Sequence, residues 1–201
     1  MKKIILASGN KGKLKELQTI LADLKVELSP QPRTSDYEVE ETGTTFVENA
    51  IIKARHASAL SGLPAIADDS GLVIEALNGE PGVKTARYAG IDCSAQDNMD
   101  LILEKLKPFD DKNQRKATFV CALVYMRSAN DPLPIIAVGQ WHGAITREKH
   151  GYKGFGYDPV FWDFKHKKTA AQMPKDLKTK LSHRGQACEL LKKQLDNLWS
   201  K

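Results

Sequence analysis

The chain has 201 residues, of which 41% are hydrophobic and 27% are charged, and its formal net charge is +5. This length fits one domain of ordinary size, or one domain with two lobes, and the composition is typical of a globular fold. No apolar run approaches the ~20 residues needed to cross a bilayer, and the N-terminus runs into a strand pattern without a signal peptide, so we expect a cytoplasmic protein with no membrane partner.

The positive charge favours an anionic partner but does not indicate nucleic acid. Nucleic-acid binders usually carry a basic stripe with interleaved aromatics, and the short basic run at residues 165–168 is interpreted as a solvated loop. The three cysteines, Cys93, Cys121 and Cys188, are far apart and form no C-x-x-C pair. We therefore expect neither a disulfide framework nor a zinc site.

The first elements frame a glycine loop. Residues 3–7 form an apolar run that predicts a buried strand, and residues 13–24 have the periodicity of an amphipathic helix. Between them stand Ser8, Gly9, Asn10, Lys11, Gly12 and Lys13. A strand, a glycine turn and a helix are how phosphate loops are built, although this spacing matches neither of the two familiar glycine motifs. Two lysines lie here at the start of the helix, where the macrodipole disfavours positive charge, and such an arrangement is typical of a ligand site. On the loop alone, an ordinary strand-to-helix turn is an equally good interpretation.

The next segment carries acidic residues and a second helix. Residues 26–28 predict a strand. The irregular stretch at residues 30–43 contains Glu40 and Glu41, which could contribute to a Mg²⁺ site. Thr45 and Glu48 have capping-box spacing, so we expect a helix that begins there and ends before Gly62 and Pro64. Lys53 lies on the polar side of this helix, where it could reach a phosphate or remain solvated.

Two adjacent carboxylates, Asp68 and Asp69, follow a short predicted strand at residues 65–67 and precede another at residues 72–77. Ligands in open α/β sheets bind beyond the carboxyl ends of strands. A pair of carboxylates there can hold Mg²⁺, or one can accept a proton from water. The alternative is a turn closing a strand pair. Beside a phosphate loop, the pair becomes a metal-and-base candidate.

The second half of the chain predicts paired strands and a closing helix. Ser94 is expected to cap a helix through residue 107, and residues 117–127 and 135–141 predict an antiparallel pair. The glycine-aromatic loop at residues 151–159 could stack on a nucleobase, or it could be a turn with core aromatics. Ser182 is expected to cap the last helix, whose first turn carries His183 and Arg184, cations that favour a ligand site. Alternating helices and strands followed by paired strands indicate a mixed α/β sheet.

Six segments, taken together, resemble a known family. SGNKGKLKEL, EETGTTFVENAIIKARHA, ADDSGL, PGVKTARYAG, GFGYDPVF and SHRGQA are similar, in this order, to motifs of the inosine/xanthosine triphosphate pyrophosphatase family, and the resemblance covers essentially the whole chain. It implies a single domain over residues 1–201, an elongated mixed β-sheet with flanking helices, two lobes around a central cleft, and a homodimer. It also implies Mg²⁺-dependent hydrolysis of dITP, ITP and XTP to the monophosphate and pyrophosphate.

The resemblance also implies residue roles. Asp69 matches the general base and a metal ligand, and Glu41 matches the second metal carboxylate, with Glu40 and Asp68 as further metal candidates. The substrate contacts that it implies are the loop Ser8, Gly9, Asn10, Lys11, Gly12 and Lys13, then Ser70, Lys178, His183 and Arg184, with Phe155, Gly156, Tyr157 and Asp158 as the base pocket. Lys53 is expected to stabilise the pyrophosphate leaving group. Family members commonly have Thr where Ser8 stands, and either hydroxyl can serve.

Two other functions remain open from the residues. A nucleotide-binding regulator would need the glycine loop but not the carboxylates, and a related scaffold could hydrolyse modified pyrimidine nucleotides. For a purine substrate, Arg184 or a backbone N–H that donates to the 6-oxo group would reject adenine, whose 6-amino group is itself a donor. Guanine must be rejected through its 2-amino group, by a residue that the sequence does not identify.

Overall fold

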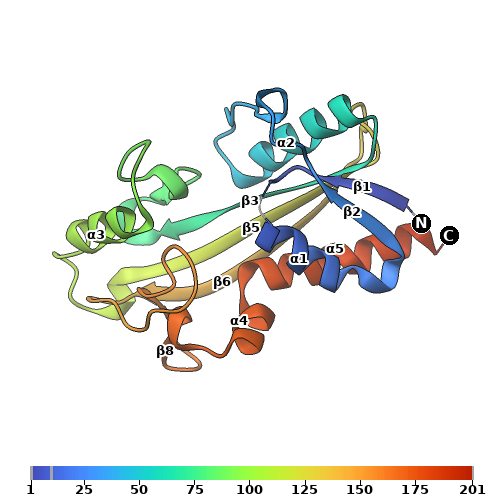
Figure 1. Ribbon diagram of the computed structural model, residues 1–201. Helices are drawn as coiled ribbons and strands as arrows, with labels where there is room; N and C mark the ends of the chain where they lie inside the picture. The colour runs from blue at the N-terminus through green and yellow to red at the C-terminus, as the bar shows by residue number, and fades with distance from the viewer. Residues whose placement is uncertain (1, 10, 201) are drawn as a thin grey trace. The chain divides into compact units, whose positions relative to one another are not determined.

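A computed structural model describes residues 2–9 and 11–200. Its strands form one eight-stranded sheet in the order β2-β1-β3-β5-β6-β7-β8, with β4 paired to β3 (Figure 1). The strands are β1 (Lys2–Leu6), β2 (Val26–Pro30), β3 (Ala65–Ile74), β4 (Pro81–Gly82), β5 (Lys116–Met126), β6 (Ile135–Ile145), β7 (Phe161–Asp163) and β8 (Lys168–Thr169). The helices are α1 (Lys11–Ile20), α2 (Phe46–Ser61), α3 (Ala95–Lys105), α4 (Lys175–Leu181) and α5 (His183–Trp199). The predicted mixed α/β class is confirmed.

The chain divides into two compact units. Unit 1 contains Met1–Asp69, Cys121–Gly139 and Arg184–Lys201, and unit 2 contains Ser70–Val120 and Gln140–His183. Each unit has its own hydrophobic core. Within the part of the chain that the structure describes, no helix is long and apolar enough to cross a membrane.

Unit 1 is a sheet with helices on both faces (Figure 1). Successive side chains of a strand point to opposite faces, so neighbouring residues enter different cores. Ile4 and Ile66 belong to the core that includes α1 and α5, whereas Ile5, Ala65 and Ala67 belong to the core that includes α2. This alternation determines which helix each polar residue of the same strand can meet.

The core of unit 2 is built around aromatic rings. Phe119 on β5 lies 4.4 Å from Phe161 on β7, measured between ring centroids, and Phe161 lies 5.0 Å from Trp141 on β6. Met99 and Ile102 place α3 in the same core. The same core includes Tyr157, so the loop at residues 151–159 packs against it.

Several predicted boundaries differ from the structure. In place of the two strands expected at residues 65–67 and 72–77 there is one continuous strand, β3, which ends at Ile74, and Glu75–Leu77 form a 3₁₀ turn. The pairing of β3 in the sheet overrides the turn preference of Asp68–Gly71. Helix α1 begins two residues earlier than expected, and a separate 3₁₀ turn, Ala22–Leu24, follows it. Helix α4 and the short strands β7 and β8 were not predicted.

Other local predictions are confirmed. Thr45 and Ser94 each form a capping box, with Glu48 and Asp97 respectively, and helices α2 and α3 begin directly after them. β5 and β6 are neighbours joined by residues 127–134, a connection too short for a parallel crossover, so the pair is antiparallel as expected.

Candidate active site

The glycine loop connects β1 to α1 in unit 1. β1 pairs in parallel with β2, and Leu6 lies opposite Pro30, so residues that follow the two strands meet at one edge of the sheet. Ser8 and Gly9 follow β1, and Lys11 and Gly12 open the first turn of α1. Asn10 lies outside the described residues. Backbone N–H groups at the start of a helix attract anions, so the geometry suits a phosphate.

Three predicted residues of unit 1 form one ion cluster. The Nζ of Lys53, on α2, lies 2.8 Å from Oε1 of Glu41 and 2.8 Å from Oδ1 of Asp69. Asp69 is on the β3 face that packs against α2, which explains why it meets Lys53. The structure thus brings together two carboxylates and the cation that links them.

The electrostatics of this cluster follow from burial. Burial raises the pKa of Asp69, and the Lys53 ammonium only partly opposes the effect. Burial lowers the pKa of Lys53, but the two carboxylates outweigh it and the net shift is upward. The Oδ2 atom of Asp69 is buried and has no hydrogen-bond partner among residues 2–9 and 11–200. A buried oxygen of this kind is suited to a water molecule or a metal ion.

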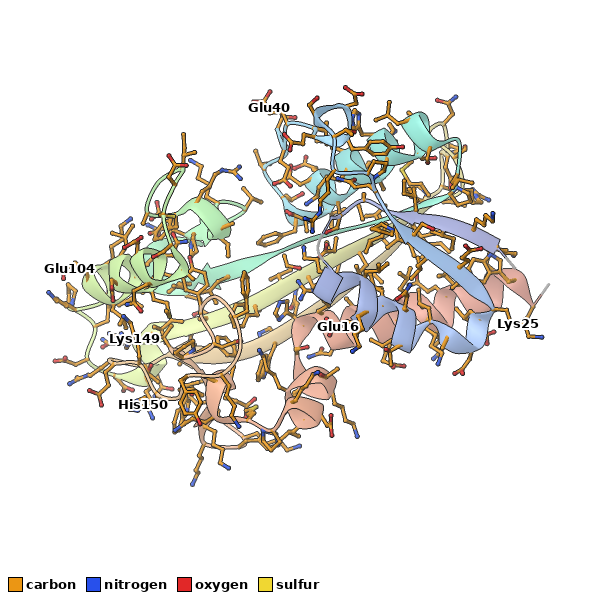
Figure 2. All side chains as sticks on the ribbon, in the orientation of Figure 1. Glu16, Lys25, Glu40, Glu104, Lys149 and His150 are labelled. Atoms are coloured by element: carbon orange, nitrogen blue, oxygen red, sulfur yellow. The ribbon has the colours of Figure 1, made fainter. Side chains whose placement is uncertain are left out.

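Two carboxylates in this cluster, those of Glu41 and Asp69, are available to hold a magnesium ion. In the described residues, no three His, Cys, Asp or Glu side chains are grouped to hold a metal. Mg²⁺ is commonly held by one or two carboxylates together with substrate phosphates and water, so Glu41 and Asp69 are a sufficient donor set. Glu40 is exposed and lies on the outer side of its segment (Figure 2), which favours Glu41 as the second carboxylate.

Asp68 belongs to a different cluster of unit 1. Its Oδ1 lies 2.8 Å from Nζ of Lys13, and its Oδ2 lies 3.3 Å from Nη2 of Arg184. Burial raises the pKa of Asp68, but the two cations more than offset this and hold the pKa well below its usual range. Asp68 is therefore a buried, ionised carboxylate that links α1 to α5.

A pocket of about 240 Å³ opens beside Lys53 and Glu41. Its other lining residues are Ala7, Gln31, Tyr37, Glu38 and Val39, all in unit 1. Carboxylates and an ammonium group in its wall give this pocket the chemistry of a polar, charged ligand site.

The glycine-aromatic loop lies in unit 2. Gly154 and Gly156 have φ values of 95° and 60°, a region that favours glycine. Phe155 exposes 86% of its surface, whereas Tyr157 is buried and its hydroxyl donates a 2.7 Å hydrogen bond to the Thr85 carbonyl. Of the two predicted aromatic contacts, only the Phe155 ring is available to stack on a base. Tyr157 anchors the loop to the core.

Three more predicted contacts lie in unit 2. Lys178 on α4 forms an ion pair with buried Asp158, whose carboxylate also accepts a 2.6 Å hydrogen bond from the Phe155 N–H. His183 stacks on Phe119, with ring centroids 4.8 Å apart. Ser70, on β3, is half-buried. The structure thus brings Lys178 and Asp158 together, and Asp158 holds the loop in place.

Arg33 is a candidate that the sequence did not indicate. Its Nη2 donates a 3.0 Å hydrogen bond to the carbonyl of Gly9, and its side chain lies against that glycine. Arg33 follows β2 and Gly9 follows β1, so the contact depends on parallel pairing of the two strands. The sequence alone does not predict that contact, because it requires knowledge of how the two strands pair.

Comparisons with known proteins agree with this architecture. Residues 4–194 match the model of the Ham1 family. The chain is 50% identical over 197 residues to a dITP/XTP pyrophosphatase of Shigella flexneri and 49% identical to that of Escherichia coli strain K12; each alignment covers 98% of this chain and 100% of the relative. Among solved structures, a HAM1 protein from Coxiella burnetii has a TM-score of 0.93 at 49% identity, covering 98% of this chain and 100% of that one. The Staphylococcus aureus Ham1 protein has a TM-score of 0.89 at 40% identity with the same coverage.

Proposed function

The chain belongs to the Ham1 family, and we propose that it hydrolyses non-standard purine nucleoside triphosphates, dITP, ITP and XTP, to the monophosphate and pyrophosphate. It is a nucleoside triphosphate pyrophosphatase that removes deaminated purines from the nucleotide pool. The observation that carries the mechanism is the Glu41–Lys53–Asp69 cluster, in which a buried carboxylate oxygen has no protein partner within the described residues.

The phosphates are assigned to the cationic groups of unit 1. The glycine loop offers backbone N–H groups at the start of α1, and Lys13 lies in the first turn of that helix. Lys53 faces the two carboxylates and carries the charge that suits a departing pyrophosphate. Arg33 adds a guanidinium beside Gly9.

The proposed reaction requires a magnesium ion. Glu41 and Asp69 would hold the ion, which when bound supplies charge neutralisation to the triphosphate. Asp69 orients a water molecule and accepts its proton, and the raised pKa that burial gives this carboxylate makes it a stronger base. The oxygen of that water forms a bond to the α-phosphorus, the bond from this phosphorus to the bridging oxygen breaks, and pyrophosphate leaves.

Two features are assigned to base choice, each within its own unit: the glycine-aromatic loop of unit 2 and Arg184 of unit 1. The exposed Phe155 ring can stack on a purine. Arg184, or a backbone N–H, donates to the 6-oxo group and so discriminates against adenine. Tyr157 is left out of base contact in this assignment, because its ring and hydroxyl are used in the core of unit 2.

We include a homodimer and a cytoplasmic location in the proposal. Leu133 is 74% exposed, and Ile136 and Val138 on the outer face of β6 are 38% and 36% exposed, an apolar strip that a second copy of the chain would cover. The location follows from the substrates, which arise in the nucleotide pool. Sedimentation of the wild type and of Val138→Lys tests the assembly, since the charge would dissociate a dimer formed through this strip.

The activity is tested with a panel of triphosphates. The protein is incubated with magnesium chloride and dITP, ITP, XTP, dATP, dGTP or dCTP in water enriched in oxygen-18, and the products are separated. We expect monophosphate and pyrophosphate from the first three substrates, with the label in the monophosphate because attack is at the α-phosphorus.

Each alternative gives a different result. Diphosphate and inorganic phosphate as products would indicate cleavage between the β- and γ-phosphates. Label in pyrophosphate would place the attack on the β-phosphorus. Turnover of a pyrimidine triphosphate alone would assign a different substrate class. Binding without turnover would indicate a nucleotide-binding regulator.

A further inference from the structure

The adjacent carboxylates Asp68 and Asp69 face different partners. Asp69 lies on the β3 face that meets α2, and its Oδ1 pairs with Lys53. Asp68 lies on the opposite face, the one that meets α1 and α5, and pairs with Lys13 and Arg184. Successive side chains of a strand point to opposite faces of the sheet, so the two neighbours contact different helices and have different roles in the site.

Asp68 is bound by cations on both oxygens. Its side chain is 2% exposed, so almost all of its charge must be balanced by protein groups. A divalent cation at these oxygens would place a third positive centre beside Lys13 and Arg184. By contrast, Asp69 keeps a buried oxygen without a partner in the described residues. Coordination of a metal therefore suits Asp69 and not Asp68.

The two cations that Asp68 holds lie at unfavourable positions. Lys13 is in the first turn of α1 and Arg184 is in the first turn of α5, where the helix dipoles disfavour positive charge. One buried carboxylate compensates both. The Nε of Arg184 is also buried without a hydrogen-bond partner in the described chain, which leaves a donor for a ligand.

We propose that Asp68 is a positioning residue that fixes Lys13 and Arg184 as a pair for the substrate, and that it is not a metal ligand. This inference rests on the proposed function, which assigns both cations to the nucleoside triphosphate. Asp68 touches neither substrate nor metal in this role. It acts through the two side chains that it orients.

The test compares Asp68→Asn with Asp69→Asn in the full chain. Binding of Mn²⁺ to the protein alone is measured by calorimetry, and KM and kcat are measured for dITP with Mg²⁺. For Asp68→Asn we expect Mn²⁺ affinity near that of the wild type and a KM about tenfold higher, the effect of one misplaced charge-assisted hydrogen bond, with a smaller change in kcat. For Asp69→Asn we expect Mn²⁺ affinity to fall by about tenfold or more.

Two outcomes overturn the assignment directly. Loss of Mn²⁺ affinity in Asp68→Asn equal to that in Asp69→Asn would make Asp68 a metal ligand. An unchanged KM in a folded Asp68→Asn protein would remove the positioning role. Glu16 is the matched control, because its Oε2 lies 3.9 Å from Nη1 of Arg184 (Figure 2 shows Glu16 on α1). A KM rise in Glu16→Gln as large as in Asp68→Asn would show that any nearby negative charge suffices, which contradicts the proposal.

A mutant cycle keeps the proposal testable if Asp68→Asn fails to fold. Lys13→Met, Arg184→Met and the double variant are compared by their KM for dITP. Because one carboxylate orients both cations, we expect the double variant to raise KM by less than the product of the single effects. Multiplicative effects would mean that the two cations act independently and would overturn the proposal.

Failure of the proposed function has its own signature. If the wild-type protein leaves dITP intact, the activity is wrong, and the positioning role is then measured by equilibrium binding of inorganic tripolyphosphate. Asp68→Asn should weaken that binding by about tenfold. Equal binding by wild type and Asp68→Asn would reject the positioning role independently of any turnover.

Discussion

Substitution of Lys53 by Met tests the central ion cluster. The ammonium of Lys53 lies 2.8 Å from each of two carboxylates, Glu41 and Asp69, and its side chain is 17% exposed. Met has a similar length and no charge, so Lys53→Met leaves the two carboxylates facing each other without a counter-ion. Lys53→Arg is the matched control, because it retains the charge.

The expected loss of stability can be estimated from these contacts. Hydrogen bonds to charged groups contribute about 1.5–3 kcal/mol each, and removal of one member of a fully buried pair costs about 3–5 kcal/mol. Because the carboxylates are partly solvated, with side-chain exposures of 25% for Glu41 and 11% for Asp69, we expect a loss of about 2–3 kcal/mol. For a chain of this size, each kcal/mol lowers Tm by about 2–4 °C, so the melting temperature should fall by roughly 4–12 °C.

Thermal unfolding followed by circular dichroism measures the effect. Without divalent cations, Lys53→Met should melt at a lower temperature than the wild type and Lys53→Arg. Added Mg²⁺ should stabilise Lys53→Met more than the wild type, because the ion replaces the lost positive charge. A Lys53→Met protein that melts within a degree of the wild type, with the same response to Mg²⁺, would refute the coupling of the two carboxylates through Lys53.

The same substitution predicts a change in the pH profile. Burial raises the pKa of Asp69 and the Lys53 ammonium lowers it, so removal of the ammonium raises this pKa further. The base must be ionised to accept a proton, and activity is lost as the pH falls through its pKa. The acidic limb of kcat/KM should therefore move to higher pH in Lys53→Met, and a limb that stays in place would contradict the role of Asp69 as base.

Three further substitutions test other parts of the site. Asp69→Asn should lower kcat for dITP by about 10²–10⁴-fold, the contribution of a general base, and a turnover number near that of the wild type would exclude this role. Arg33→Ala should raise KM for dITP by about tenfold through loss of a guanidinium at the phosphate loop. The matched control is Arg55→Ala, because exposed Arg55 also donates one hydrogen bond to a backbone carbonyl; equal KM values for the two variants would reject the Arg33 contact. Tyr157→Phe should cost about 1 kcal/mol in the free energy of unfolding, since it removes the hydrogen bond to Thr85, and should leave the ratio of dITP to dATP turnover unchanged; a changed ratio would place Tyr157 at the base.

The sequence by itself determined several local elements and the chemical types of residue at the site. Capping boxes at Thr45 and Ser94 locate two helix starts to the residue, because the cap depends only on side chains within one turn. The strand, glycine turn and helix at the N-terminus are also local patterns. The motifs in register identified the family, and the family comparison agrees with that reading.

The tertiary structure decided which charges meet. The sequence treated Asp68 and Asp69 as one acidic pair after a short strand, whereas β3 is continuous and its alternation directs them to different helices. From the sequence, Lys53 was expected either to reach a phosphate or to be solvated. The fold instead places its ammonium beside two carboxylates. The contact of Arg33 with the glycine loop depends on the parallel pairing of β1 and β2. Periodicity and capping are short-range and can be read from residue order, but ion pairs form wherever the sheet and its helices bring side chains within a few ångströms.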